Sequence, residues 1–205
     1  KLCYIKEMKT ERLDNLSDGI FAIVMTILVF QIKIPLSENI SNVKLWNEIV
    51  KIQPVFLSYL LSFALLYTYW KAHHFFTSIY AKNVDANLIN INAVFFMFVS
   101  LIPFSADLLS RHSENELSVI IFSIHIILIG LCLFWMRGYV FYSKHIQNPE
   151  ISFNSLHGTT IHTLAPIFFA IVAIILSFID TKFSLIVLTL SVIFNLLPYS
   201  KKLIG

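Results

Sequence analysis

The sequence predicts an all-α integral membrane protein, and two observations indicate this class. The chain is apolar: of its 205 residues, 57% are hydrophobic and 13% are charged, whereas an average soluble domain has about 25% charged residues. The charges are also spaced so that six long stretches between them hold no Asp, Glu, Lys or Arg. A helix that crosses a bilayer needs about 20 mostly apolar residues. We therefore expect six transmembrane helices in a single domain that covers residues 1–205.

The six stretches justify one helix each, in chain order. They run over Gly19–Ile32, Ile52–Trp70, Ala86–Ala106, Leu117–Met136, Ile151–Ile179 and Phe183–Ser200. The second, third, fourth and sixth have 18 to 21 residues and fit a membrane as they stand. The fifth has 29 residues and a polar first third, so its helix is expected to start near Ile161. The first has only 14 residues and reaches membrane length if its helix starts near Asn15. The predicted spans are about 15–34, 52–70, 86–106, 117–136, 161–179 and 183–200.

Lysine and arginine set the expected orientation of these spans. Segments on the amino-terminal side of the membrane carry ten of them, and the opposite loops carry five. Because cytoplasmic loops carry the excess of positive charge, both termini are expected in the cytoplasm. On the other side, the connection Lys33–Lys51 includes a run from Ser37 to Trp46 that suggests a small extracytoplasmic helix.

The first span is unusual because Ser17 and Asp18 must lie at the bilayer edge or inside it. An ionisable group there is costly unless it is paired, which makes it a candidate functional site. The alternative is an acid in the first helical turn, where a negative charge suits the positive end of the helix dipole. The spacing alone favours neither interpretation.

The residues give little support for an enzyme, a metal protein or a nucleic-acid-binding protein. The sequence has no HExxH pair, P-loop or GxGxxG, and Ser17 lacks a GxSxG elbow. The seven histidines lack the spacing of metal ligands, so no metal or other cofactor is expected. A net charge of +3 is too small to favour nucleic acid. The predicted spans have no mid-membrane carboxylate, which argues against an Asp/Glu proton relay.

One face of the first span carries an apolar stripe with a single hydroxyl group, that of Thr26. The residues of this stripe follow the three-and-four spacing of a helix face: Gly19, Ile23, Thr26, Ile27, Phe30 and Ile34. The stripe could face lipid or the core, with Thr26 bonding back to the carbonyl of residue 22 or 23. A ring of such helices could instead line a narrow apolar passage that gates by dewetting.

Three segments of the first half carry a family resemblance. They are Arg12-x4-Ser17-Asp18-Gly19-Ile20-Phe21-Ala22-Ile23 followed by Thr26, Tyr69–Phe75, and Asn90–Phe104 with its ending Leu-Ile-Pro-Phe. In this order they resemble the transmembrane protein 175 family of potassium-permeable channels, which is represented in bacteria and in animal lysosomes. The resemblance covers roughly Arg12 to Asp107. It departs from the family signature at Leu16, where the family has an aromatic residue.

The resemblance implies a role for each residue of the stripe. Ile23 matches the position of the family's tightest hydrophobic constriction, and Thr26 matches a threonine layer linked to cation preference. Ile27 and Phe30 continue the same pore-lining face toward the extracytoplasmic side.

The resemblance also implies a polar network and an assembly. Arg12, Ser17 and Asp18 match residues that join the first helix to its neighbours, and Trp70 and His73 match their partners. Bacterial members have one six-helix unit per chain and form tetramers. The implied protein is a homotetramer in the bacterial inner membrane, with the first helix of each subunit around a central pore.

The leading hypothesis is therefore a weakly selective, potassium-permeable channel with a hydrophobic gate. A secondary transporter or exporter of small molecules is the alternative, although the two halves show no internal repeat of the kind such transporters have. Proton leak through the same pore and a structural membrane protein without transport are further alternatives.

Overall fold

The structure is a computed structural model that describes residues 10–33, 41–150 and 156–196, with no side chains described for 156–162. Its described elements are all helical, apart from one isolated bridge between Ala81 and Gln147. The all-α class is thereby confirmed. In chain order the elements are α1 (Thr10–Ile27), the 3-10 turn η1 (Leu28–Gln31), α2 (Asn42–Lys51), α3 (Gln53–His74), the π-helical turn η2 (Phe75–Ile79), α4 (Ala86–Ser100), α5 (Ile102–Arg111), α6 (Glu116–Tyr142), α7 (Leu156–Ser177) and α8 (Thr181–Leu196).

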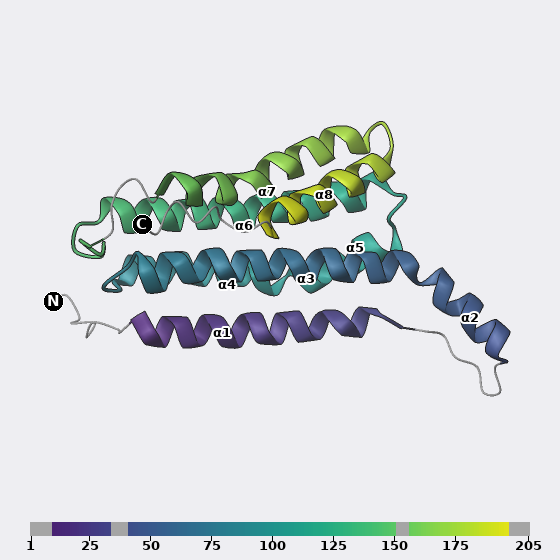
Figure 1. The fold of residues 1–205 in the computed structure, drawn as a ribbon, viewed down its shortest axis with the longest axis horizontal. Helices are drawn as coiled ribbons and strands as arrows, with labels where there is room; N and C mark the ends of the chain where they lie inside the picture. The colour runs from purple at the N-terminus through teal and green to yellow at the C-terminus, as the bar shows by residue number, and fades with distance from the viewer. Residues whose placement is uncertain (1–9, 34–40, 151–155, 197–205) are drawn as a thin grey trace.

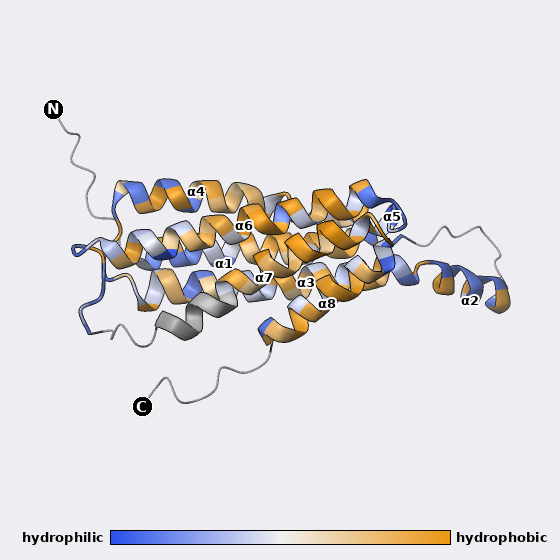
Figure 2. Cartoon of the chain, turned by 90° about the horizontal axis from the view of Figure 1, so that it is seen from above, coloured by the Kyte–Doolittle hydropathy of each residue, from blue (hydrophilic) through white to orange (hydrophobic). Residues whose placement is uncertain are grey.

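The helices form an elongated bundle of three layers (Figure 1). Helix α1 forms one edge and packs on α3 and α4, which lie in the middle with α5. Helices α6, α7 and α8 form the opposite edge, and α2 projects from one end of the bundle. Hydrophobic residues dominate the middle of the bundle, while polar residues gather toward its two ends and along α2 (Figure 2).

Among the described residues, three helical segments are long and apolar enough to cross a membrane: Thr10–Gln31, Ala86–Arg111 and Glu116–Tyr142. A fourth candidate is the pair Asn42–Lys51 and Gln53–Ile79, which is bent by 48°. The apolar segments Thr163–Ser177 and Thr181–Leu196 are shorter. The structure thus supports three or four spans by length and composition, and the count of six stays a prediction. Residue 34 of the first predicted span and residues 197–200 of the last lie outside the described residues.

Several helices extend past the charges that bound the apolar stretches. Helix α1 begins at Thr10, so Ser17 and Asp18 lie two turns inside it instead of near its start. Helix α3 continues through Lys71 to His74, and α6 continues through Arg137 to Tyr142. A charge interrupts an apolar stretch but not a helix, because Lys and Arg are good helix formers.

The short helix expected in the first long connection is displaced toward its end. It runs from Asn42 to Lys51, and its amino terminus is capped by Ser41, whose side chain accepts a hydrogen bond from the backbone N–H of Lys44. The predicted start at Ser37 falls among residues that are not described.

The third predicted span is a broken helix. Helix α4 ends at Ser100 and α5 begins at Ile102, one residue before Pro103. Proline has no backbone N–H, so it removes one hydrogen bond of the helical ladder. His125 of α6 contacts both sides of the break: its Nε2 donates to the Phe98 carbonyl at 2.8 Å, and its Nδ1 lies 2.8 Å from the Ser105 hydroxyl.

The second half of the chain packs through small residues. A Cβ atom added at Gly130 of α6 would lie 2.6 Å from the side chain of Ile167 in α7. Ala170 and Ala173 of α7 are fully buried, and the Ser184 hydroxyl of α8 donates to the Ala173 carbonyl at 2.8 Å. Small residues let membrane helices approach closely. The close approach increases van der Waals contact between the helices, which matters in lipid because the hydrophobic effect does not drive helices together there.

A candidate pore helix and its anchors

Helix α1 has one face packed into the bundle and one face open. Its buried residues, continued through η1, recur at three-and-four spacing: Leu13, Ser17, Phe21, Val24, Leu28 and Gln31. The described residues of the predicted pore-lining stripe lie on the other side and are exposed: Ile23 is 59% exposed, Ile27 42% and Phe30 71%. A Cβ added at Gly19 would meet nothing within 4 Å. The stripe is therefore a surface of the single chain, free to face lipid or other subunits.

Thr26 presents its hydroxyl on this open face in a fixed orientation. Its Oγ1 donates to the carbonyls of Ala22 at 2.9 Å and Ile23 at 2.8 Å. The hydroxyl hydrogen is therefore directed into the helix, and the oxygen lone pairs point outward. An outward array of lone pairs attracts cations and repels anions.

A buried hydrogen-bond relay anchors α1 to the middle layer. The Ser17 hydroxyl lies 3.1 Å from Nδ1 of His73 in α3, and Nε2 of His73 lies 2.6 Å from Oδ1 of Asn92 in α4. The Asn92 amide in turn donates to the Leu88 carbonyl at 2.7 Å. One neutral tautomer of His73, with the proton on Nε2, satisfies all four groups. All three relay side chains are buried, so the relay fixes α1 against two helices at once.

Aromatic rings surround the histidine of this relay. The His73 ring stacks on Phe95 with a centroid distance of 5.1 Å and an interplanar angle of 9°. Phe96 and Phe21 lie at 5.3 Å and 6.4 Å from it. Phe21 thereby links the anchored face of α1 to the same apolar cluster.

Two further contacts connect the same end of α1 to α3 and η2. Trp70 donates its Nε1–H to Oδ1 of Asp18 at 2.7 Å, and the Thr77 hydroxyl donates to Oδ1 of Asp14 at 2.6 Å. The structure thus gives the Asp18 carboxylate a hydrogen-bond partner on α3.

Of the five residues in the predicted polar network, the structure joins four, as the pairs Ser17–His73 and Asp18–Trp70. Arg12 is exposed and makes no hydrogen bond or ion pair within the described chain. Leu16, at the position of the missing aromatic, is 52% exposed and does not contribute to the buried core.

The far end of α1 has an anchor that the sequence did not reveal. Gln31, the last residue of η1, is 9% exposed and donates its side-chain N–H to the Pro103 carbonyl at 2.8 Å. This contact fixes the end of the stripe, next to Phe30, to the broken span. A glutamine between apolar residues is the signal that could have indicated it, as Asn92 in an apolar helix could have indicated the relay.

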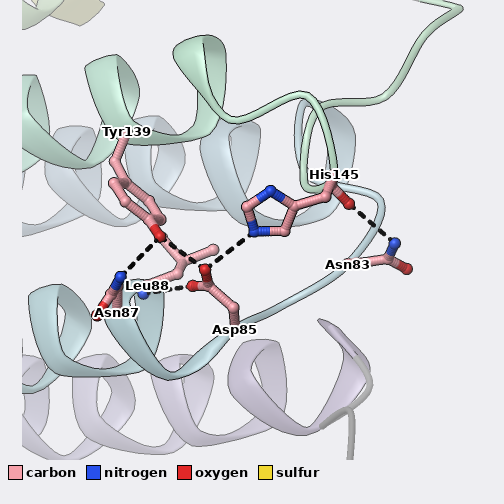
Figure 3. Close-up of polar contacts among 6 residues, drawn as sticks. All are labelled: Asn83, Asp85, Asn87, Leu88, Tyr139 and His145. Atoms are coloured by element: carbon pink, nitrogen blue, oxygen red, sulfur yellow. Dashed lines mark hydrogen bonds and ion pairs between the residues drawn. The ribbon is translucent and has the colours of Figure 1, made fainter.

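A second polar cluster connects the two halves of the chain at the end of the bundle where α1 begins (Figures 1 and 3). Asp85 caps α4 by accepting the Leu88 N–H at 2.8 Å. The same carboxylate accepts the Tyr139 hydroxyl of α6 at 2.6 Å and lies 3.1 Å from Nε2 of His145. Partial burial raises the pKa of Asp85, but the hydrogen bonds from Tyr139, Leu88 and His145 outweigh it and hold that pKa below its usual range.

The described residues contain no group of three or more His, Cys, Asp or Glu side chains that could hold a metal ion.

Comparisons with known proteins show which proteins are similar to this chain in sequence and in fold. A model of the family described as endosomal/lysosomal potassium channel TMEM175 matches residues 12–103, close to the range that carries the sequence resemblance. The solved crystal structure of a lysosomal potassium-selective channel TMEM175 homolog from Chamaesiphon minutus superposes with a TM-score of 0.74 at 25% identity. That superposition covers 91% of this chain and 95% of the other. The chain therefore resembles the TMEM175 family in sequence over residues 12–103 and shares the fold of this homolog over most of its length.

The sequence relatives of this chain bear two kinds of name. A potassium channel of Chamaesiphon minutus is 33% identical over 107 residues, which are 52% of each chain. A potassium channel of a Chryseobacterium species is 30% identical over 114 residues, 54% of this chain and 55% of the relative. The human endosomal/lysosomal proton channel TMEM175 is 23% identical over 206 residues, 96% of this chain and 39% of the relative. The matches thus span about half the length of these two bacterial relatives.

Proposed function

We propose that this protein is a potassium-permeable, weakly selective cation channel that conducts ions passively. The observation that carries the proposal is the open face of α1, which presents an apolar stripe with one outward hydroxyl oxygen. The opposite face of the helix is packed into the bundle, which fixes the orientation of the stripe. One helix cannot enclose a passage, so the pore needs several copies. The names of the bacterial relatives, potassium channels, support the choice of ion.

The proposed assembly is a homotetramer in which each chain spans the membrane six times and contributes α1 to a central pore. The excess of Lys and Arg on the amino-terminal side supports cytoplasmic termini, and the proposed location is the bacterial inner membrane. A map of the purified complex tests the assembly directly. We expect fourfold symmetry with Ile23 nearest the axis, and any arrangement that places the stripe against lipid contradicts the proposal.

In the proposed mechanism, Ile23 is the main barrier. The Ile23 side chains of the subunits form an apolar constriction that offers no ligand to a potassium ion. The ion must therefore lose part of its hydration shell there without a replacement ligand. Thr26 lies about 4.5 Å further along the helix axis and offers oxygen lone pairs that replace part of the hydration shell. Ile27 and Phe30 continue the apolar lining.

The test is potassium flux into liposomes that contain purified protein. Ile23→Asn supplies a polar group at the barrier, and we expect it to raise the flux at least roughly tenfold, which corresponds to about 1.4 kcal/mol of barrier. Leu131→Asn on α6 is the matched control, because Leu131 is 49% exposed and lies outside α1; its flux should equal that of the wild type. Absence of potassium flux in the wild type, together with no change in Ile23→Asn, contradicts the pore.

Proton conduction through the same pore is the second candidate. The mammalian relatives are named proton channels, and a narrow apolar constriction could pass protons along a transient chain of water. Under a pH gradient without a potassium gradient, a proton pathway moves the reversal potential toward the proton equilibrium potential. A potassium pathway leaves it near zero.

A further inference from the structure

We infer that a groove between α3 and α8 is a binding site for one phospholipid with a zwitterionic, amine-bearing headgroup such as phosphoethanolamine. The two helices pack together at one side of the bundle (Figure 2). The groove between them has a volume of about 840 Å³. The inference requires that these helices lie in the bilayer, and it does not depend on which ion the protein conducts.

The body of the groove fits an acyl chain. Its walls are aliphatic and come from both helices: Leu57, Leu60, Leu61 and Ala64 of α3, and Leu185, Ile186, Leu190, Val192 and Ile193 of α8. The two polar groups among them are already bonded within the protein. The Ser58 hydroxyl donates to the Ala106 carbonyl and the Thr189 hydroxyl to the Leu185 carbonyl. The interior of the groove therefore fits an apolar ligand, because none of its described polar side chains needs a further hydrogen bond.

The length of the groove matches one leaflet. It extends along residues 53–64 of α3 and residues 181–193 of α8, which is about 17 Å at the rise of an α-helix. Half of a hydrocarbon core of about 30 Å is about 15 Å. One acyl chain inserted from the bundle end near α2 fills this length, and it comes from the leaflet at that end.

The mouth of the groove carries both charge signs. Glu114 and Lys182 line the same end of the groove with Gln53, Ser113 and Thr181. Both charged side chains are exposed, and neither forms an ion pair with another described residue. A phosphate has a cation to approach at Lys182, and an ammonium group has an anion to approach at Glu114. A headgroup without the amine meets an uncompensated carboxylate there.

The mouth also has room for a headgroup. A polar hollow of about 650 Å³ shares Pro54, Ser113 and Glu114 with the groove and continues toward Lys51 and His112. The acyl-chain groove and the polar hollow are thus continuous at Glu114, as the two parts of a phospholipid are.

The experiment compares two lipids that differ only in the headgroup. Purified protein is reconstituted in vesicles with equal amounts of phosphatidylethanolamine and phosphatidylglycerol of identical acyl chains, extracted in mild detergent, washed and analysed by native mass spectrometry. We expect roughly threefold more retained phosphatidylethanolamine, because an exposed charge contact is worth about 0.2–1 kcal/mol. Equal retention of the two lipids overturns the headgroup assignment.

Variants locate the bound lipid. Glu114→Gln should bring the two lipids to parity, whereas Lys33→Gln, an exposed lysine at the same end, should leave their ratio unchanged. Leu60→Trp should remove the retained lipid by filling the groove, and Leu131→Trp on α6 should not. Lipid that survives both Leu60→Trp and Ala64→Phe in correctly folded protein overturns the site.

A photo-reactive residue at position 57 separates the two possible occupants. A cross-link to phospholipid supports the site, and a cross-link to a second copy of the chain overturns it in favour of a subunit interface. These experiments measure the mass of bound species and not ion flux. The lipid site can therefore be disproved without disproving the channel function, and the channel function can be disproved without disproving the lipid site.

Discussion

The two halves of this protein are held together in different ways. In the first half, buried side chains bond across helices, as in the Ser17–His73–Asn92 relay and the Gln31 contact to the broken span. In the second half, small residues bring α6, α7 and α8 together, with Gly130 of α6 against Ile167 of α7. Directional hydrogen bonds fix the rotation of a helix, whereas small-residue contacts fix mainly its separation from a neighbour. The helix whose rotation decides which face is open, α1, lies in the half with the directional bonds.

The relay offers the strongest way to test this difference. We expect His73→Ala to lower the free energy of unfolding by about 2–3 kcal/mol, since it leaves a cavity and two buried polar groups without partners. In a chain of this size this corresponds to roughly 4–12 °C in the melting temperature of the detergent-solubilised protein.

The adjacent histidine is the matched control for this variant. His74 is exposed; its Nδ1 lies 3.0 Å from the Ser78 hydroxyl, and its ring stacks on that of Trp70 with a centroid distance of 6.0 Å, outside the buried relay. His74→Ala should shift the melting temperature by less than about 2 °C. If the two alanine variants melt alike, the relay does not anchor α1.

The second half should respond to volume instead. Gly130→Val places a branched side chain where a Cβ already lies 2.6 Å from Ile167, and we expect a loss of about 1–2 kcal/mol from overpacking. A Cβ at Gly138 on the same helix meets nothing within 4 Å, so Gly138→Val should leave the melting temperature unchanged or slightly raised. Equal losses in both variants contradict the close-packing explanation, because helix propensity alone favours valine over glycine.

This contrast also explains what the sequence could predict. Charge-free stretches predicted an all-α membrane protein, and the family resemblance at Ser17, Asp18, Trp70 and His73 implied an anchored first helix. Such patterns can be recognised in a sequence because each requires a particular type of side chain at a particular position. The contact of Gly130 could not be predicted in this way, because a glycine in an apolar helix does not specify its partner.

Two features needed the three-dimensional structure. The extent of the helices was underestimated at Lys71 and Arg137, since hydropathy measures burial in lipid and a helix can continue into water. The Gln31 and Asn92 contacts depend on distances between helices far apart in sequence, and the spacing within one helix does not contain that information.

The smallest expected effect lies where the two halves meet, at Asp85. Its carboxylate bonds to Tyr139 and His145 of the second half and caps α4 of the first. Its pKa is lower in the folded protein than in the unfolded chain, so its contribution to stability is present above the unfolded value of about 3.9 and is lost as the pH falls through the folded value. We expect Asp85→Asn to cost about 1 kcal/mol at pH 6, chiefly by weakening the contacts of the carboxylate with Tyr139 and His145, because asparagine caps a helix about as well as aspartate.

That cost, measured from pH 6 downward, should shrink below about pH 4, where the wild-type carboxylate takes up a proton. The measurement is the difference in melting temperature between wild type and Asp85→Asn across this range. Asn87→Ala is a useful companion, because Asn87 donates to the Tyr139 hydroxyl at 3.1 Å and not to the carboxylate; its cost should not change with pH in the same window. A cost of Asp85→Asn that stays constant down to pH 3 shows that the cluster stabilises the junction by shape alone. In that case the charge of Asp85 does not hold the halves together.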